Sequence, residues 1–157
     1  MIISDYLVKQ FAFYCLICYH KNMKAMGIDF GLARIGIALS DDTKFLATPT
    51  ETYKRVNIEQ DIQHLIDIIS TKKVDEIVCG LPMNMAGEEQ EIASKTREFM
   101  SVLQSKHSIK VLFVDERLSS LMAEEMLKET ERDWKKRKEK LDAVAASIIL
   151  QDYLDAR

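Results

Sequence analysis

The segment from Met23 to Asp41, MKAMGIDFGLARIGIALSD, predicts how the sheet of this protein begins. It contains two short apolar runs, residues 24–30 and 34–40, which are separated by a glycine-led turn and are typical of a β-hairpin. Asp29 lies inside the first run, with glycines close by in the hairpin. A buried carboxylate is costly unless it is paired or bound to a cation. The segment therefore indicates a strand pair that carries a candidate binding site.

Beyond the hairpin, strand-like and helix-like patterns alternate along the chain. Residues 45–53 predict a third strand, in which Pro49 indicates an edge position or a break. Asn57 is expected to cap the helix that follows. The later expected elements are a helix from residue 58, a strand at 75–80, a helix through 92–103, a strand at 110–114, a helix from 118 and a last helix over 141–154.

This order of elements predicts an α/β fold with a mixed five-stranded sheet and helices on both faces. A hairpin followed by β-α-β units gives both antiparallel and parallel strand pairs, and the crossover helices cover the sheet. The 157 residues suffice for one domain with a full core, and the chain contains no internal repeat and no linker. One compact domain is therefore expected.

Residues 1–22 differ from the rest, because they are aromatic and apolar with few charges. A signal peptide would need a small-residue cleavage site, and a membrane helix would need a longer apolar stretch. We expect instead an N-terminal extension outside the fold, with the domain running from Met23 to Arg157. The segment's Cys15 and Cys18 lack the second ligand pair that zinc requires, which favours incidental thiols in a reducing cytoplasm.

Acidic residues follow the strands that we expect to be parallel. Asp29 lies near the end of the first strand, Asp115 and Glu116 follow the last, and Asp142 is expected to open the last helix on an alanine-lined face. Ligands of open α/β sheets bind beyond the carboxyl ends of the strands. Each acid alone could be a turn former, a helix cap or an ion-pair partner. Together they predict oxygen ligands for Mg²⁺ or Mn²⁺, ions that in pairs cleave phosphodiesters.

A basic run precedes Asp142 and is expected to interrupt the helical pattern. Its residues are Lys135, Lys136, Arg137, Lys138 and Lys140. The net charge of −3 means that nucleic-acid binding would need such a local patch. A solvated helix end and a phosphate-binding surface both fit the run, and Trp134 beside it either packs under the loop or stacks on a base.

Four segments in this order, GIDFGLARIGIALSD, GLPMNMAGEE, VDERLSS and LDAVAASIILQDYL, resemble the YqgF family. These Holliday-junction-resolvase-like proteins are usually described as pre-16S rRNA nucleases. The resemblance covers Met23 to the C-terminus and implies a ribonuclease H-like nuclease domain. It departs from the family where the loop after GLPMNMAG reads EEQ, since members often carry a second glycine there.

The resemblance also implies roles for individual residues. It identifies three acids as catalytic and metal-binding residues for Mg²⁺ or Mn²⁺: Asp29, Glu116 and Asp142. It identifies three further positions that contact phosphate or orient the acids: Arg34, Asn84 and Arg117. Asp115 is a further acid of the same region. We add four residues of the basic run to the expected nucleic-acid-binding set: Lys135, Lys136, Arg137 and Lys138.

The function expected from residues and resemblance is a cytoplasmic, metal-dependent endonuclease that processes the 5′ end of pre-16S rRNA. Its partner would be nucleic acid, either precursor rRNA or branched DNA, with no membrane involved and a monomer or weak homodimer as the assembly. Two alternatives stay open: a Holliday-junction DNA resolvase and a non-catalytic RNA-binding factor of ribosome assembly. An actin-like ATPase or sugar kinase would need a second related domain, which this chain lacks.

Overall fold

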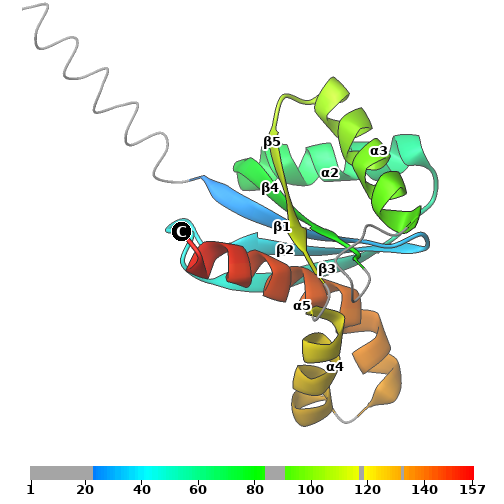
Figure 1. Cartoon of the computed structure of the whole chain (residues 1–157), viewed down its shortest axis with the longest axis vertical. Coiled ribbons are helices and arrows are strands. Elements are labelled where there is room, and N and C mark those ends of the chain that lie inside the picture. The colour runs from blue at the N-terminus through cyan, green and yellow to red at the C-terminus, as the bar shows by residue number, and fades with distance from the viewer. Residues whose placement is uncertain (1–22, 84–90, 117–118, 132) are drawn as a thin grey trace, which may run out of the picture.

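The computed structural model describes residues 23–83, 91–116, 119–131 and 133–157 (Figure 1). The N-terminal extension, Cys15, Cys18, Asn84 and Arg117 lie outside the described residues. The elements in chain order are β1 Lys24–Phe30, β2 Arg34–Ser40, β3 Ala47–Lys54, α2 Ile58–Lys72, β4 Val74–Leu81, α3 Glu91–Lys106, β5 Lys110–Asp115, α4 Ser119–Thr130 and α5 Trp134–Asp155.

The strands form one five-stranded sheet in the order β3-β2-β1-β4-β5. β1 pairs antiparallel with β2 and parallel with β4, while β4 pairs parallel with β5 and β2 pairs antiparallel with β3. The prediction of a mixed five-stranded sheet is confirmed. Because α2 and α3 cover one face and α5 covers the other, the molecule has the layers of a ribonuclease H-like fold (Figure 1).

Alternation along β1 explains the two layers. Met26, Ile28 and Phe30 belong to the large core cluster that includes the apolar faces of α2 and α3. The intervening positions face α5 and are mostly small: Ala25 packs in a second cluster with residues of α5, and Gly27 presents only its backbone. One face of the strand is therefore built for bulky packing and the other for close approach of a helix.

Glycines on this second face allow α5 to lie almost on the sheet backbone. A Cβ on Gly27 would stand 2.5 Å from the carbonyl oxygen of Ala146, and a Cβ on Gly36 would overlap the carbonyl oxygen of Asp142. Side chains larger than hydrogen would push the helix away. The glycines around Asp29 thus bring the Asp142 turn of α5 directly over β2.

The third strand begins at Ala47, two residues later than expected, because a side chain closes the preceding turn. Asp41 Oδ1 accepts hydrogen bonds from the backbone N–H groups of Phe45 (2.8 Å) and Leu46 (2.9 Å), and Lys44 has a positive φ of 54°. Those N–H groups are therefore not available to a strand ladder. The edge position indicated by Pro49 is confirmed, since β3 is the edge strand and its register shifts beside that proline.

The last helix corrects the sequence prediction. It begins at Trp134 and contains the basic run, so Asp142 lies in its interior, not at its start. Lysine, arginine and glutamate are strong helix formers, and neither glycine nor proline interrupts them here. Asp133 immediately precedes the helix, and its carbonyl oxygen accepts the first helical hydrogen bond from Arg137 N–H at 3.0 Å.

Helix α4 and the first half of α5 form a helical hairpin that extends beyond the sheet (Figure 1). Ala123 and Leu127 of α4 pack with Val144, Ala145 and Ile148 of α5 in a small core of their own. Within the described part of the chain, no helix combines the length and apolarity needed to cross a membrane.

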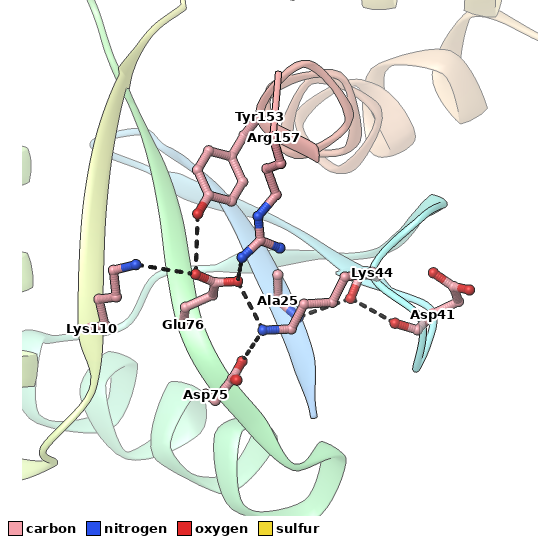
Figure 2. Close-up of polar contacts among 9 residues, drawn as sticks. Ala25, Asp41, Lys44, Asp75, Glu76, Lys110, Tyr153 and Arg157 are labelled. Carbon is pink, nitrogen blue, oxygen red and sulfur yellow. Dashed lines mark hydrogen bonds and ion pairs between the residues drawn. The ribbon is translucent and has the colours of Figure 1, made fainter. Parts of the chain in front are cut away.

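At the far end of α5, the buried carboxylate of Glu76 joins four elements (Figure 2). One carboxylate oxygen lies 2.8 Å from Lys44 Nζ and 3.0 Å from an Arg157 guanidinium nitrogen. The other accepts a hydrogen bond from the Tyr153 hydroxyl at 3.2 Å and lies 3.6 Å from Lys110 Nζ. This cluster ties α5 to β4, β5 and the turn before β3.

Candidate active site

Asp29 comes from the central strand β1 and faces α5. Gly36 of β2 lies directly opposite it in the ladder, and Gly80 of β4 is one residue beyond the partner of Ile28. The carboxylate is therefore bordered by two residues without side chains. Burial, and next the negative charge of Asp142, raise the pKa of Asp29 to about 7.

Glu116 is positioned by the end of β5. Its backbone N–H donates to the carbonyl oxygen of Leu81 at 3.3 Å, which extends the β4–β5 pairing by one residue. Its carboxylate lies against the Cα of Gly80, because a Cβ there would overlap Oε2. Burial, and then the charges of Asp29 and Asp115, raise the pKa of Glu116 to about 8.

Asp142 comes from α5 and meets a cation from the sheet. The Nε atom of Arg34, at the start of β2, lies 2.6 Å from Oδ2 of Asp142. The Asp142 side chain is 20% exposed and that of Arg34 is 38% exposed. Oδ2 is itself buried, and among the described residues no donor is aligned to hydrogen-bond it, so the Arg34 contact is an ion pair only.

The three predicted acids are thus neighbours at one end of the sheet, although they come from elements far apart in the chain. Their mutual repulsion is visible in the pKa values: the charge of Asp142 raises that of Asp29, and the charge of Asp29 raises that of Glu116. Asp115 is exposed and adds to the repulsion at Glu116. Three carboxylates in one region are the hard oxygen donors that Mg²⁺ and Mn²⁺ prefer.

The side chains do not, however, form a closed coordination sphere. In the described residues, no group of three His, Cys, Asp or Glu side chains is close enough to hold a metal ion as it stands. The donor chemistry suits a divalent ion, and side-chain movement would have to complete the site. The metal assignment of Asp29, Glu116 and Asp142 stays a prediction.

The basic run lies on the first turns of α5, and some of its side chains are described. Lys136 is exposed, and Arg137 is partly buried, where it donates a hydrogen bond to the carbonyl oxygen of Glu131 at 3.0 Å. The side chains of Lys135 and Lys138 lie outside the described part. At about 1.5 Å per residue, Lys136 is about 9 Å along the helix axis from Asp142, so the run leads up to the acids.

Sequence reasoning missed the buried Arg55–Asp61 ion pair at the end of β1. Arg55 Nε lies 2.8 Å from Oδ2 of the fully buried Asp61, and its guanidinium donates to the carbonyl oxygen of Gly31 at 3.3 Å and covers the Phe30 ring at 4.6 Å. Through these contacts Arg55 holds Phe30 and Gly31, the two residues that follow Asp29. The spacing of Asp61 with Leu65 and Ile69, at i, i+4 and i+8, was the signal that this acid faces the core.

A protein-family comparison identifies the chain. The model of the RuvX family, described as Holliday junction resolvase, matches residues 23–156. The chain belongs to the RuvX family. This is the family recognised above as YqgF from four motifs, so the resemblance is confirmed over the same part of the chain.

Curated proteins similar to this RuvX chain carry the name "Putative pre-16S rRNA nuclease". One from Endomicrobium trichonymphae is 41% identical over 133 residues, which cover 84% of this chain and 95% of the relative. Another from Halothermothrix orenii is 43% identical over 133 residues, which cover 85% of this chain and 95% of the relative.

Solved structures confirm the fold of this RuvX member. RuvC of T. thermophilus, in complex with a Holliday junction substrate, matches with a TM-score of 0.56 at 14% identity, covering 86% of this chain and 95% of RuvC. The fowlpox virus resolvase in complex with Holliday junction DNA matches with a TM-score of 0.53 at 15% identity, covering 85% of this chain and 98% of the resolvase chain. At these identities the likeness shows the fold alone.

Proposed function

We propose that this protein is a metal-dependent endonuclease that cleaves precursor 16S rRNA. The observation that carries the proposal is the meeting of Asp29, Glu116 and Asp142, from three separate elements, at the carboxyl end of the central strands, with the pKa values of Asp29 and Glu116 raised towards neutrality. Perturbed carboxylates at such an edge are typical of a functional site.

Asp29, Glu116 and Asp142 would hold Mg²⁺ or Mn²⁺. When bound, such an ion activates a water molecule for attack on phosphorus and stabilises the leaving oxygen. The chain's own residues prepare the site. Asp29 and Glu116 retain protons up to about pH 7 and 8 in the metal-free protein, so metal binding must release protons and strengthen with pH.

Arg34 and the basic start of α5 would hold the substrate's phosphates. Arg34 is partly exposed beside the acids, and a guanidinium suits a phosphate geometrically. Lys136 is exposed on the first turn of α5, on the N-terminal side of Asp142. A phosphate backbone laid from this helix to the acids would present a phosphodiester to Asp29, which is consistent with the names of the curated relatives.

The proposal is tested by cleavage assays with Mg²⁺ and Mn²⁺ on precursor 16S rRNA and on four-way junction DNA. Wild type is compared with Asp29→Asn and with Asp67→Asn, a matched control at an exposed acid of α2. We expect wild type and the control to cut the RNA, and Asp29→Asn to remain folded without cutting. An Asp29→Asn protein that cuts as fast as wild type would refute the site.

The same assay decides between the alternatives. Holliday junction resolvase is the second candidate, because the RuvX family model carries that description. Faster cleavage of the junction than of the RNA, by a dimer in light scattering, would favour it. RNA binding without cleavage under either ion would favour the non-catalytic assembly factor.

A further inference from the structure

The Arg34–Asp142 ion pair differs from the buried Arg55–Asp61 pair beside it in the hairpin region. Asp61 is fully buried and takes Arg55 Nε at 2.8 Å and the Val56 N–H at 2.9 Å, while Arg55 also covers Phe30. That pair is saturated and enclosed. Arg34 is 38% exposed and makes an ion pair with Asp142 at 2.6 Å without an aligned hydrogen bond. Because the Arg34 side chain is partly exposed, it can turn to another anion without becoming a buried, unpaired charge, whereas the buried Oδ2 of Asp142 then needs a different cation.

Arg34 also places a positive charge beside one of the three clustered acids, Asp142. The Asp29 carboxylate is repelled by Asp142 and the Glu116 carboxylate by Asp29, and a positive charge close to Asp142 lowers the repulsion between Asp142 and Asp29. As they stand, no three acidic side chains in the described residues can share one ion. Completion of such a site requires an acid to move, and Asp142 is the acid held by a releasable partner.

We propose that Arg34 is an internal counter-ion: it neutralises Asp142 while the site holds no metal, and a substrate phosphate draws it away so that Asp142 can turn to the ion. The inference rests on the proposed function, because it takes a divalent cation and a nucleic-acid phosphate as the two ligands. Its consequence is thermodynamic coupling, since each ligand strengthens the binding of the other by the same factor.

The phosphate is the right competitor for Asp142. A guanidinium group can donate two parallel hydrogen bonds to the oxygens of a phosphate. The present contact of Arg34 with a single oxygen of Asp142 contains no aligned hydrogen bond, so the phosphate can bind Arg34 more strongly. The backbone of Arg34 would remain in place during the exchange, because its carbonyl oxygen accepts a hydrogen bond from Gly31 N–H at 2.9 Å in the hairpin turn. The movement is therefore confined to the side chain.

Mn²⁺ affinity, measured from the electron paramagnetic resonance of free Mn²⁺, tests the coupling independently of cleavage. Each protein is titrated with and without a short phosphorothioate-substituted RNA. For wild type we expect RNA to tighten Mn²⁺ binding about tenfold. For Arg34→Gln we expect tight Mn²⁺ binding without RNA and little further change when RNA is added. Arg34→Lys retains the charge, so it should preserve part of the coupling.

A matched control is Lys24→Gln, which breaks another partly exposed ion pair, with Asp42 at 3.2 Å, at the other end of the same sheet. It should leave Mn²⁺ affinity and coupling unchanged. Weaker Mn²⁺ binding in Arg34→Gln would show that Arg34 only positions Asp142, and absence of coupling in wild type would also overturn the proposal. If Asp29→Asn binds Mn²⁺ as well as wild type, the ions bind elsewhere, and the proposed function fails instead.

Discussion

Asp29 is the central residue of the proposed site, and its position is energetically unfavourable in the absence of a cation. It lies in the central strand, faces a helix packed at close range, and has Asp142 as a charged neighbour. A protein could relieve this cost by substituting an apolar residue. The presence of a carboxylate in such a place favours a functional explanation over a structural one.

The raised pKa of Asp29 makes the stability of the metal-free protein depend on pH. Its folded-state pKa is about 7, against the usual 3.8, so between these values the folded state holds a proton that the unfolded state has lost. Stability therefore falls as pH rises from about 4 to about 7. Asp29→Asn removes this contribution, and its melting temperature should exceed that of wild type at pH 8 by several degrees but not at pH 4.

Thermal unfolding in EDTA across this pH range measures the effect. Asp67→Asn serves as the control, because Asp67 is exposed on α2. Glu116, with a pKa of about 8, adds a fall of its own, which should be smaller in Asp29→Asn because the charge of Asp29 is one cause of the raised Glu116 pKa. The difference between the two curves therefore contains the loss of the Asp29 contribution and this smaller change at Glu116. Parallel curves for wild type and Asp29→Asn would contradict the burial of Asp29.

At the scale of elements, α5 determines the site because it packs on glycines. Two substitutions separate packing from chemistry. A Cβ in Gly36→Ala meets the backbone of Asp142, which cannot yield, whereas a Cβ in Gly80→Ala meets the movable ends of the Glu116 and Ile149 side chains. We expect Gly36→Ala to lose about 1 to 3 kcal/mol of stability and Gly80→Ala to lose less stability but most of its activity, since it displaces Glu116.

Urea unfolding and a cleavage assay at equal folded fraction distinguish these outcomes. Gly27→Ala is the matched control, because its Cβ also presses on α5 but near Ala146, about one turn beyond Asp142. It should lose stability while keeping activity for each folded molecule. Full activity of Gly80→Ala would show that the position of the Glu116 carboxylate is not critical.

The basic start of α5 makes a second element-scale prediction. Lys136 and Lys140 are exposed, and if both contact phosphates their replacement by glutamine should weaken RNA binding similarly for all sequences. The slope of log affinity against log salt should fall by about 0.7 for each lost phosphate contact. Fluorescence anisotropy at several salt concentrations measures the slope, with Lys72→Gln and Lys106→Gln as controls on α2 and α3.

Local patterns predicted much of this fold and of the candidate site. Alternation and turns located the hairpin, the Asn57 cap is confirmed by its hydrogen bond from Gln60 N–H at 2.9 Å, and the rule for strand ends placed Asp29 and Glu116 together. The predicted start of the last helix was wrong, because the basic run was interpreted as a break although lysine and arginine favour helix. The position of Asp133 directly before the helix was also not recognised. The Arg34–Asp142 pair arises from tertiary packing, which no local spacing reveals.

In the molecule as a whole, the Asp142 turn in the interior of α5 and the C-terminal end of α5 have different roles. Around Asp142 the helix meets repelling carboxylates and a releasable arginine, and around Tyr153 it meets the buried Glu76 with its three cations (Figure 2). The C-terminal end can hold the helix on the sheet while the Arg34 and Asp142 side chains remain free to exchange partners in the proposed mechanism. Unfavourable electrostatics at the site are thereby offset by favourable electrostatics about 16 Å away along the helix axis.

Glu76→Gln tests this division of roles. Burial raises the pKa of Glu76, but the hydrogen bond and charge of Lys44, with the charge of Arg157, outweigh it and hold the pKa below its usual value. The stabilisation is therefore present above about pH 4.5 and is lost as pH falls through the lower folded-state pKa. We expect Glu76→Gln to lose about 2 kcal/mol of unfolding free energy at pH 7. The difference in unfolding free energy from wild type should narrow near pH 3, as measured by urea unfolding.

Cleavage for each folded molecule should be unchanged, and Glu98→Gln, at an exposed acid of α3, should match wild type throughout. An unchanged gap at both pH values would mean that the shape of Glu76, and not its charge, holds α5 in place.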